Sequence, residues 1–185
     1  MPDDPSILQL ASSDPNTREG GARELYSRGS ALIAPILARW LADAEFRGSI
    51  GSNPPQLTVG VAVVPDTFQN IRAANGNPRL AEVPPDQDAI EFELRINGVQ
   101  LDILTTKLPG GTGAISRFLE KFGEGIQQVE IDVGSVDRAT EILRTRFQLA
   151  PLYPATRAGA DGTRVNFFLT TRPDGRRVLI ELVEK

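Results

Sequence analysis

The chain has 185 residues, of which 40% are hydrophobic and 24% are charged, and its formal net charge is −4. This length suits one compact domain with an appendage, and the acidic balance without a concentrated basic surface argues against a nucleic-acid partner. The sequence has no cysteine and no histidine, which excludes disulfides, thiolate catalysis and the imidazole ligands typical of zinc, iron, nickel and copper sites. Any catalysis would therefore depend on carboxylates, Arg, Lys, Tyr, hydroxyls or amides.

The N-terminal sequence MPDDPSILQL is acidic and lacks the basic and apolar regions of a signal peptide. No apolar run approaches the ~20 residues that are needed to cross a bilayer. We therefore expect a cytoplasmic protein without a membrane partner.

Residues 1–47 contain two stretches with the apolar periodicity of helices. The first is predicted to begin near Pro15 and to end at Arg28-Gly29, and the second to carry Pro35 in its first turn. Together they resemble one helix-turn-helix unit of a HEAT-type repeat. Because one such unit cannot bury its own apolar stripe, we expect this N-terminal helical hairpin to pack on the rest of the chain or on a second subunit.

Residues 48–56 are rich in Gly, Ser and Pro and are predicted to form a linker. The following segment alternates between strand and helix signals. It predicts a strand at 57–64, a short helix at 65–74, and strands at 90–96 and 99–105. Asn97-Gly98 between the last two strands is typical of a two-residue hairpin turn.

The same order then repeats. After a loop and a connecting helix, the sequence predicts a strand at 126–133, a helix at 136–147, and two more strands joined by a turn at Asp174-Gly175. We interpret this as an internal duplication, with modules at about 57–108 and 124–185. The fold class is therefore predicted to be α+β, with two curved sheets around a shared cleft.

The predicted strands each have an apolar face and a polar face. The polar positions are Thr58, Glu91, Glu93, Gln100, Asp102, Gln128, Glu130, Asp132 and Glu181. We interpret Glu93, Glu130 and Asp132 as solvent-facing side chains. Glu181 differs because its same-face neighbours are the apolar Leu179 and Val183, so its carboxylate needs either an ion-pair partner or a function.

Three segments carry a resemblance to a known family: FLEKFGEGIQQVEIDV, DGTRVNFFL and DGRRVLIELVE. They are similar to the vicinal-oxygen-chelate superfamily, the group of glyoxalases, bleomycin-resistance proteins and dihydroxybiphenyl dioxygenases, and within it they resemble the methylmalonyl-CoA epimerases. The resemblance spans residues 57–185. It implies a glyoxalase-like fold of two βαβββ modules with a metal ion in the cleft.

The resemblance also implies the site residues. Thr58 and Gln128 match the two metal-ligand histidines, while Asp102 and Glu181 match the other two ligands. The implied metal site is therefore degenerate, with Thr58, Asp102 and Gln128 as ligand-binding residues and no assigned metal or other cofactor. A hard cation such as Mg²⁺ or Ca²⁺ on these oxygen atoms is an alternative that we rank below an empty site.

Glu91 and Glu181 match the two proton-transfer carboxylates of the epimerases. They imply a catalytic alternative, in which a proton alpha to a thioester carbonyl is removed on one face and returned on the other. Three functions stay open: a module that binds a small acyl or carbonyl ligand, an enzyme of the lyase or isomerase type, and an interaction protein that uses its N-terminal helices. A homodimer is compatible with each of them.

Overall fold

A computed structural model describes residues 4–52, 54–172, 175 and 177–185. The chain divides into two compact units, each built from two separate segments. Unit 1 comprises Met1–Arg28 and Thr58–Gln127, and unit 2 comprises Gly29–Leu57 and Gln128–Lys185. Each unit has its own hydrophobic core, and the two units are described separately.

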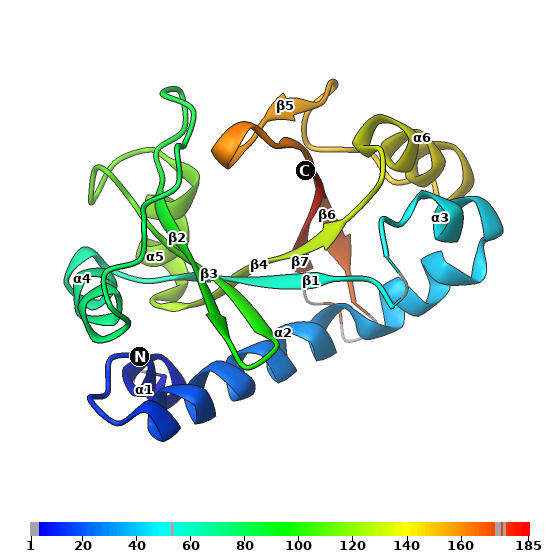
Figure 1. Ribbon diagram of the computed structural model, residues 1–185. Coiled ribbons are helices and arrows are strands. Elements are labelled where there is room, and N and C mark those ends of the chain that lie inside the picture. Colours follow the sequence, from blue (N-terminus) through cyan, green and yellow to red (C-terminus); the bar gives the residue numbers. More distant parts are fainter. Residues whose placement is uncertain (1–3, 53, 173–174, 176) are drawn as a thin grey trace. The chain divides into compact units, whose positions relative to one another are not determined.

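The N-terminal segment forms helices α1 (Pro5–Leu10), α2 (Pro15–Ala42) and α3 (Ala44–Ser49) (Figure 1). The pair α1 and α2 is consistent with an N-terminal helical hairpin, although its two helices differ from the two that were predicted. The predicted helix end at Arg28-Gly29 is wrong, because α2 continues through both residues and carries Pro35 in its interior. The buried side chains Leu25 and Ile33 lie on either side of Gly29, and their packing in the cores of units 1 and 2 outweighs the weak helix propensity of glycine.

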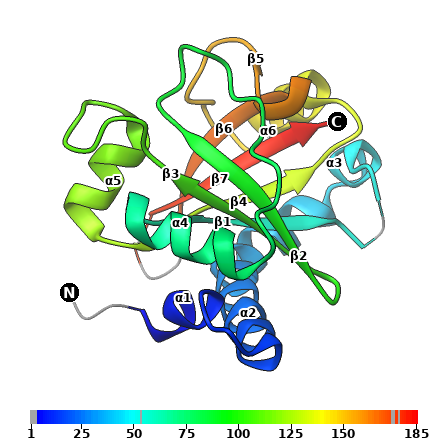
Figure 2. The ribbon, with the colours of Figure 1, turned by 60° about the vertical axis from the view of Figure 1, so that its left-hand side comes forward.

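Unit 1 has the sheet order β2-β3-β1, formed by β1 (Leu57–Ala62), β2 (Ile90–Ile96) and β3 (Val99–Thr105). β1 and β3 are parallel, while β2 and β3 form an antiparallel hairpin, visible as two neighbouring arrows in Figure 2. Asn97 and Gly98 have φ angles of 45° and 82°, which confirms the predicted two-residue turn. Helices α4 (Pro65–Ala74) and α5 (Ala114–Phe122) complete this unit.

The segment between α4 and β2 contains no strand among its residues, all of which are described. It contains Pro78, Pro84 and Pro85, which lack the N–H group that a sheet ladder needs. One backbone hydrogen bond, from the Ala81 N–H to the Glu91 carbonyl at 2.9 Å, still ties it to β2. Unit 1 therefore has one strand fewer than unit 2.

Unit 2 has the sheet order β4-β7-β6-β5. Its elements are β4 (Gly125–Asp132), α6 (Val136–Arg146), β5 (Arg157–Ala158), the 3-10 turn η1 (Ala160–Gly162), β6 (Arg164–Thr171) and β7 (Arg177–Glu184). β4 and β7 are parallel, and β6 pairs with β7 in the antiparallel sense. The turn predicted at Asp174-Gly175 lies partly outside the described residues.

The apolar faces of the strands point into the cores, as the alternation predicted. In unit 1, α4 contributes Phe68, whose ring meets Phe92 edge-on with centroids 4.9 Å apart. In unit 2, Trp40 and Phe46 pack against each other at 5.3 Å and join α2 and α3 to the core under β4 and β7. The mixed sheets and covering helices confirm the α+β class. The prediction that the two sheets enclose one cleft concerns both units and stays a prediction.

Candidate functional site

Two predicted site residues of unit 2, Gln128 and Glu181, are in direct contact. The Gln128 Nε2 atom donates a hydrogen bond to Glu181 Oε2 at 2.5 Å. Both residues are buried, with 6% and 8% of their surface exposed. Since β4 and β7 are parallel neighbours, their register brings together residues that are 53 positions apart in the sequence. The contact gives the Glu181 carboxylate a partner, as its position between apolar neighbours required.

Glu130, which was predicted to face solvent, is a third member of this group. Its Cα is the register partner of Glu181, and its Oε1 accepts a longer hydrogen bond of 3.3 Å from Gln128 Nε2. Glu130 is half-buried, so its interpretation as a solvent-facing side chain is wrong. Its spacing of two residues from Gln128 places it on the same face of β4 and was the available signal.

The Gln128 amide therefore lies between two carboxylates. A buried carboxylate is destabilised unless hydrogen-bond donors replace the water that it loses, and the amide N–H groups supply such donors. We call Gln128, Glu130 and Glu181 the amide–carboxylate cluster. It presents acceptor oxygens and one amide from adjacent strands of the unit 2 sheet.

The predicted residues of unit 1 share one face of its sheet. Thr58 lies on β1, Glu91 on β2 and Asp102 on β3. Asp102 has Gly60 and Glu93 as its two Cα register partners. Asp102 and Glu91 are half-buried.

Thr58 is the most enclosed of these positions, with 2% of its surface exposed. Its hydroxyl oxygen is buried and has no hydrogen-bond partner within the part of the chain that the structure describes. An unpaired buried hydroxyl is unfavourable in a folded protein, so this group is a candidate to contact a ligand or a water molecule.

The neighbouring polar residues of unit 1 are paired with each other. The Gln100 amide donates to Glu93, and the Arg95 guanidinium forms an ion pair with the same carboxylate at 2.9 Å. Glu93 is exposed, as predicted. Asp132 of unit 2 is not solvent-facing as predicted, because only 18% of its side chain is exposed and it pairs with Lys185.

The donor atoms available for a metal ion are oxygens and amides. Histidine and cysteine are absent from the whole sequence. Among the described residues, no group of three or more Asp or Glu side chains is arranged to hold a metal ion. In the amide–carboxylate cluster, the Gln128 amide donates to one of the two carboxylate oxygens of Glu181.

No helix in the described part of the chain combines the length and apolar character that a membrane span requires.

Comparison with known proteins gives matches among solved structures. No model of a protein family matches the sequence, and no curated protein matches it. The methylmalonyl-CoA epimerase of Mycobacterium tuberculosis is 30% identical, with a TM-score of 0.55 over 69% of this chain and 85% of that one. A variant of the Streptomyces coelicolor enzyme in complex with 2-nitronate-propionyl-CoA is 25% identical, with a TM-score of 0.53 over 69% and 94% of the two chains.

A further methylmalonyl-CoA epimerase, in complex with methylmalonyl-CoA and NH4+, is 26% identical, with a TM-score of 0.53 over 69% of this chain and 92% of that one. The TM-scores above 0.5 show that this chain and these epimerases share a fold. With 30% identity to the Mycobacterium tuberculosis epimerase over 85% of its length, this chain belongs to the vicinal-oxygen-chelate superfamily, the superfamily of the methylmalonyl-CoA epimerases.

Proposed function

We propose that this protein binds a small acyl or carbonyl ligand at a degenerate metal site, in which the amide–carboxylate cluster takes the place of imidazole and metal. The hydrogen bond from Gln128 to the buried Glu181 carries the proposal. It supports a site that is held together by the protein's own groups.

The donor set does not fit the transition metals. Zn²⁺, Co²⁺ and Fe²⁺ sites in proteins use imidazole or thiolate ligands, which this sequence lacks. A hard cation prefers several carboxylate oxygens at once. Since Gln128 directs its N–H groups toward both Glu130 and Glu181, it supplies hydrogen-bond donors where such a cation would need oxygen ligands.

The proposal assigns ligand contacts to Thr58 and Asp102 as well. The Thr58 hydroxyl is a buried donor that can serve a carbonyl oxygen. Asp102 is half-buried on the same face of the unit 1 sheet. Two observations support the assignment. Thr58 and Asp102 match metal-ligand positions of the superfamily, and the face on which they lie is polar.

Coenzyme A thioesters are the first ligands to test, because related epimerases are in complex with methylmalonyl-CoA and 2-nitronate-propionyl-CoA. We expect calorimetric titration of chelator-treated protein with methylmalonyl-CoA or propionyl-CoA to give saturable binding. The variant Thr58→Val should weaken binding about tenfold, since it removes a hydroxyl while keeping the side-chain shape. The matched control Thr67→Val, on the half-buried part of α4, should leave affinity unchanged. Equal affinity in wild type and Thr58→Val would contradict the assignment.

The second candidate function is proton transfer of the epimerase type by Glu91 and Glu181. The identity to the Mycobacterium tuberculosis epimerase favours it. The missing imidazole ligands weaken it, because a metal ion is a strong stabiliser of enolate charge. Incubation with methylmalonyl-CoA in deuterated water, with and without Mg²⁺ or Mn²⁺, tests it directly. Deuterium uptake by the substrate that is lost in Glu91→Gln would establish proton-transfer activity. No uptake with any metal ion would exclude this function.

A further inference from the structure

Beside the amide–carboxylate cluster, the same face of the unit 2 sheet becomes apolar. The register partner of Glu181 on β6 is Phe167. The partners of Leu179 are Gln128 on β4 and Leu169 on β6. Paired residues of neighbouring strands point to the same side of a sheet, so these five side chains share one face. Across the three strands, this face therefore changes from polar on β4 to apolar on β6.

The apolar part of this face is accessible to solvent. Leu169 has 41% of its surface exposed, and Phe167 and Leu179 are half-buried. Cross-strand neighbours have Cβ atoms roughly 5 Å apart, so the three side chains form one continuous surface. We call Phe167, Leu169 and Leu179 the apolar patch. Single exposed apolar residues need no explanation, but a continuous apolar surface next to buried polar groups is typical of a ligand site.

The outer border of the apolar patch is fixed by the segment that precedes β5. The Leu152 N–H donates to the Phe167 carbonyl at 2.7 Å, and Asn166 Nδ2 donates to the Tyr153 carbonyl at 3.5 Å. The ring of Tyr153 meets the ring of Phe167 edge-on, with centroids 5.9 Å apart. The guanidinium of Arg157 lies over the Tyr153 ring, 4.4 Å from its centroid. Phe167 is therefore held in position, and a preformed surface of this kind binds at a lower entropic cost.

The charged groups nearest to the apolar patch are carboxylates. Glu181 lies in one row with Phe167 on one side and Glu130 on the other. A ligand carboxylate beside Glu181 would be repelled by both glutamates. It would also lose water without finding a hydrogen-bond donor on the leucine and phenylalanine side chains of the patch. An uncharged hydrocarbon group avoids both costs.

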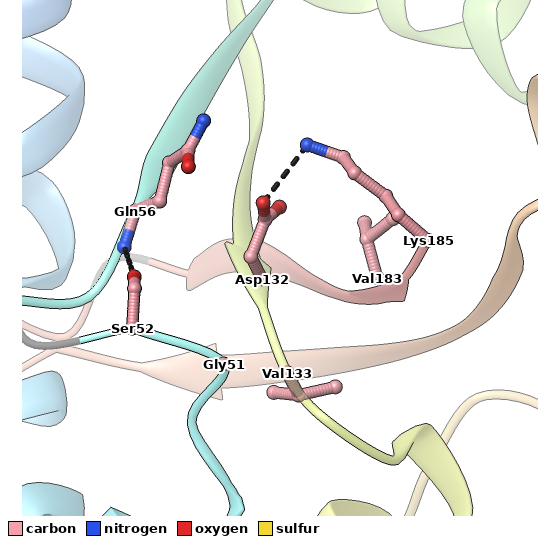
Figure 3. Close-up of a pocket in the computed structure, with 7 residues that line it drawn as sticks. All are labelled: Gly51, Ser52, Gln56, Asp132, Val133, Val183 and Lys185. Atoms are coloured by element: carbon pink, nitrogen blue, oxygen red, sulfur yellow. Dashed lines mark hydrogen bonds and ion pairs between the residues drawn. The ribbon is translucent and has the colours of Figure 1, made fainter.

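The basic side chains of this face lie at its borders. Lys185 is paired with Asp132 at 2.9 Å, at the pocket shown in Figure 3. Arg177 lies four residues before Glu181 on β7, which is roughly 13 Å along the strand. Arg157 is stacked at the outer edge. A carboxylate on the carbon next to a bound carbonyl group would therefore meet the acidic cluster before it met one of these basic groups.

We propose that the acyl group of the ligand is an uncharged hydrocarbon chain and that it packs on the apolar patch. Its carbonyl end then points toward Gln128 and β4, while its hydrocarbon end lies over β6. These two strands are two strand spacings apart, roughly 10 Å, which a short acyl thioester can span. Phe167, Leu169 and Leu179 thereby determine specificity. The inference rests on the proposed function and deepens it, because it names the class of acyl group.

The test compares two thioesters of the same shape by calorimetric titration of the full chain. Methylmalonyl-CoA has a carboxylate where isobutyryl-CoA has a methyl group. We expect isobutyryl-CoA to bind about tenfold or more tightly than methylmalonyl-CoA. Leu169→Lys places a basic group on the exposed part of the patch, so it should weaken isobutyryl-CoA, strengthen methylmalonyl-CoA and lower their affinity ratio about tenfold. The control Leu8→Lys, at a position of α1 that is 53% exposed, should leave the ratio unchanged.

The possible failures of this inference and of the proposed function are distinguishable. Equal affinities, or tighter binding of methylmalonyl-CoA, would overturn the inference and leave the proposed function standing. No binding of either thioester would overturn both. An affinity ratio that is the same in wild type and Leu169→Lys would show that the apolar patch does not contact the acyl group, and would overturn the inference as well.

Discussion

At the scale of single residues, the Gln128–Glu181 contact explains how a carboxylate stays in a mostly apolar part of a sheet. Leu179 and Val183 flank Glu181 on its own face of β7, and only 8% of Glu181 is exposed. The amide of Gln128 replaces part of the hydration that the carboxylate loses. The pair is therefore expected to matter for stability as well as for binding.

Replacing Gln128 with leucine should destabilise the fold. Gln128→Leu removes a donor from a buried carboxylate, and we expect a loss of about 1–3 kcal/mol in the free energy of unfolding. The double variant Gln128→Leu/Glu181→Leu should recover part of this loss, because no charge then stays buried. Urea unfolding measures both, with Gln69→Leu on the exposed side of α4 as a control expected to be nearly neutral. With the single variant Glu181→Leu measured as well, strictly additive effects of the two single variants would show that the residues are not coupled.

At the scale of secondary-structure elements, two adjacent glycines of α2 have opposite surroundings. A Cβ at Gly21 would lie 2.6 Å from the Ser6 carbonyl oxygen and 2.8 Å from the Gln9 Cβ, whereas one at Gly20 would meet nothing within 4 Å. Gly21 therefore permits the close approach of α1 to α2, and Gly20 serves no such purpose.

Alanine at these two positions should have effects of opposite sign. Gly20→Ala is expected to stabilise the protein by about 0.5–1 kcal/mol, because alanine is the better helix former. Gly21→Ala is expected to destabilise it by about 1–3 kcal/mol, because α1 must move away. Thermal unfolding of the two variants side by side measures the difference. A stabilised Gly21→Ala variant would mean that α1 does not pack on α2 as described.

The same helices should give part of the protein's stability a dependence on acid pH. Asp4 caps α1 through the Ser6 N–H and forms an ion pair with Arg28 at 2.6 Å. The hydrogen bond from Arg28 lowers the pKa of Asp4 below its usual value of 3.8. A carboxyl with a depressed folded-state pKa stabilises the protein above its unfolded pKa, and this contribution disappears as the pH falls through the folded pKa.

The variant Asp4→Asn keeps a good capping residue but loses the ion pair. Because the pair is partly exposed, we expect a loss of about 0.5 kcal/mol or less at pH 7, shrinking toward zero as the pH falls below 4. Denaturant titrations at pH 7, 5 and 3 measure this trend. A difference between wild type and variant that grew toward pH 3 would contradict the assignment.

The elements also show what sequence alone can predict. Asn97-Gly98 was predictable because the turn needs two positive φ angles, which these residues adopt readily. The continuation of α2 through Gly29 was not, because it depends on apolar packing in two cores built from distant segments. The pairing of Gln128 with Glu181 depends on the register of β4 and β7, and sequence similarity predicted the two positions but not their contact. The Asp132–Lys185 pocket was missed for the same reason.

At the scale of the whole molecule, α2 belongs to both units, with residues up to Arg28 in unit 1 and residues from Gly29 in unit 2. A continuous helix shared by two cores should couple their unfolding. We expect calorimetry to show one transition for the wild type and two for Gly29→Pro, because proline removes a helix hydrogen bond and clashes with the preceding turn. A single transition in Gly29→Pro would mean that α2 is not what couples the units.

We propose above that the amide–carboxylate cluster takes the place of a metal site. To test this, chelator-treated wild-type protein and the variant Glu181→Gln are each titrated with Co²⁺. Calorimetry and the visible absorption of bound Co²⁺ report the binding. We expect no saturable uptake of Co²⁺ by either protein. Binding of one equivalent of Co²⁺ to the wild type, lost in Glu181→Gln, would contradict it.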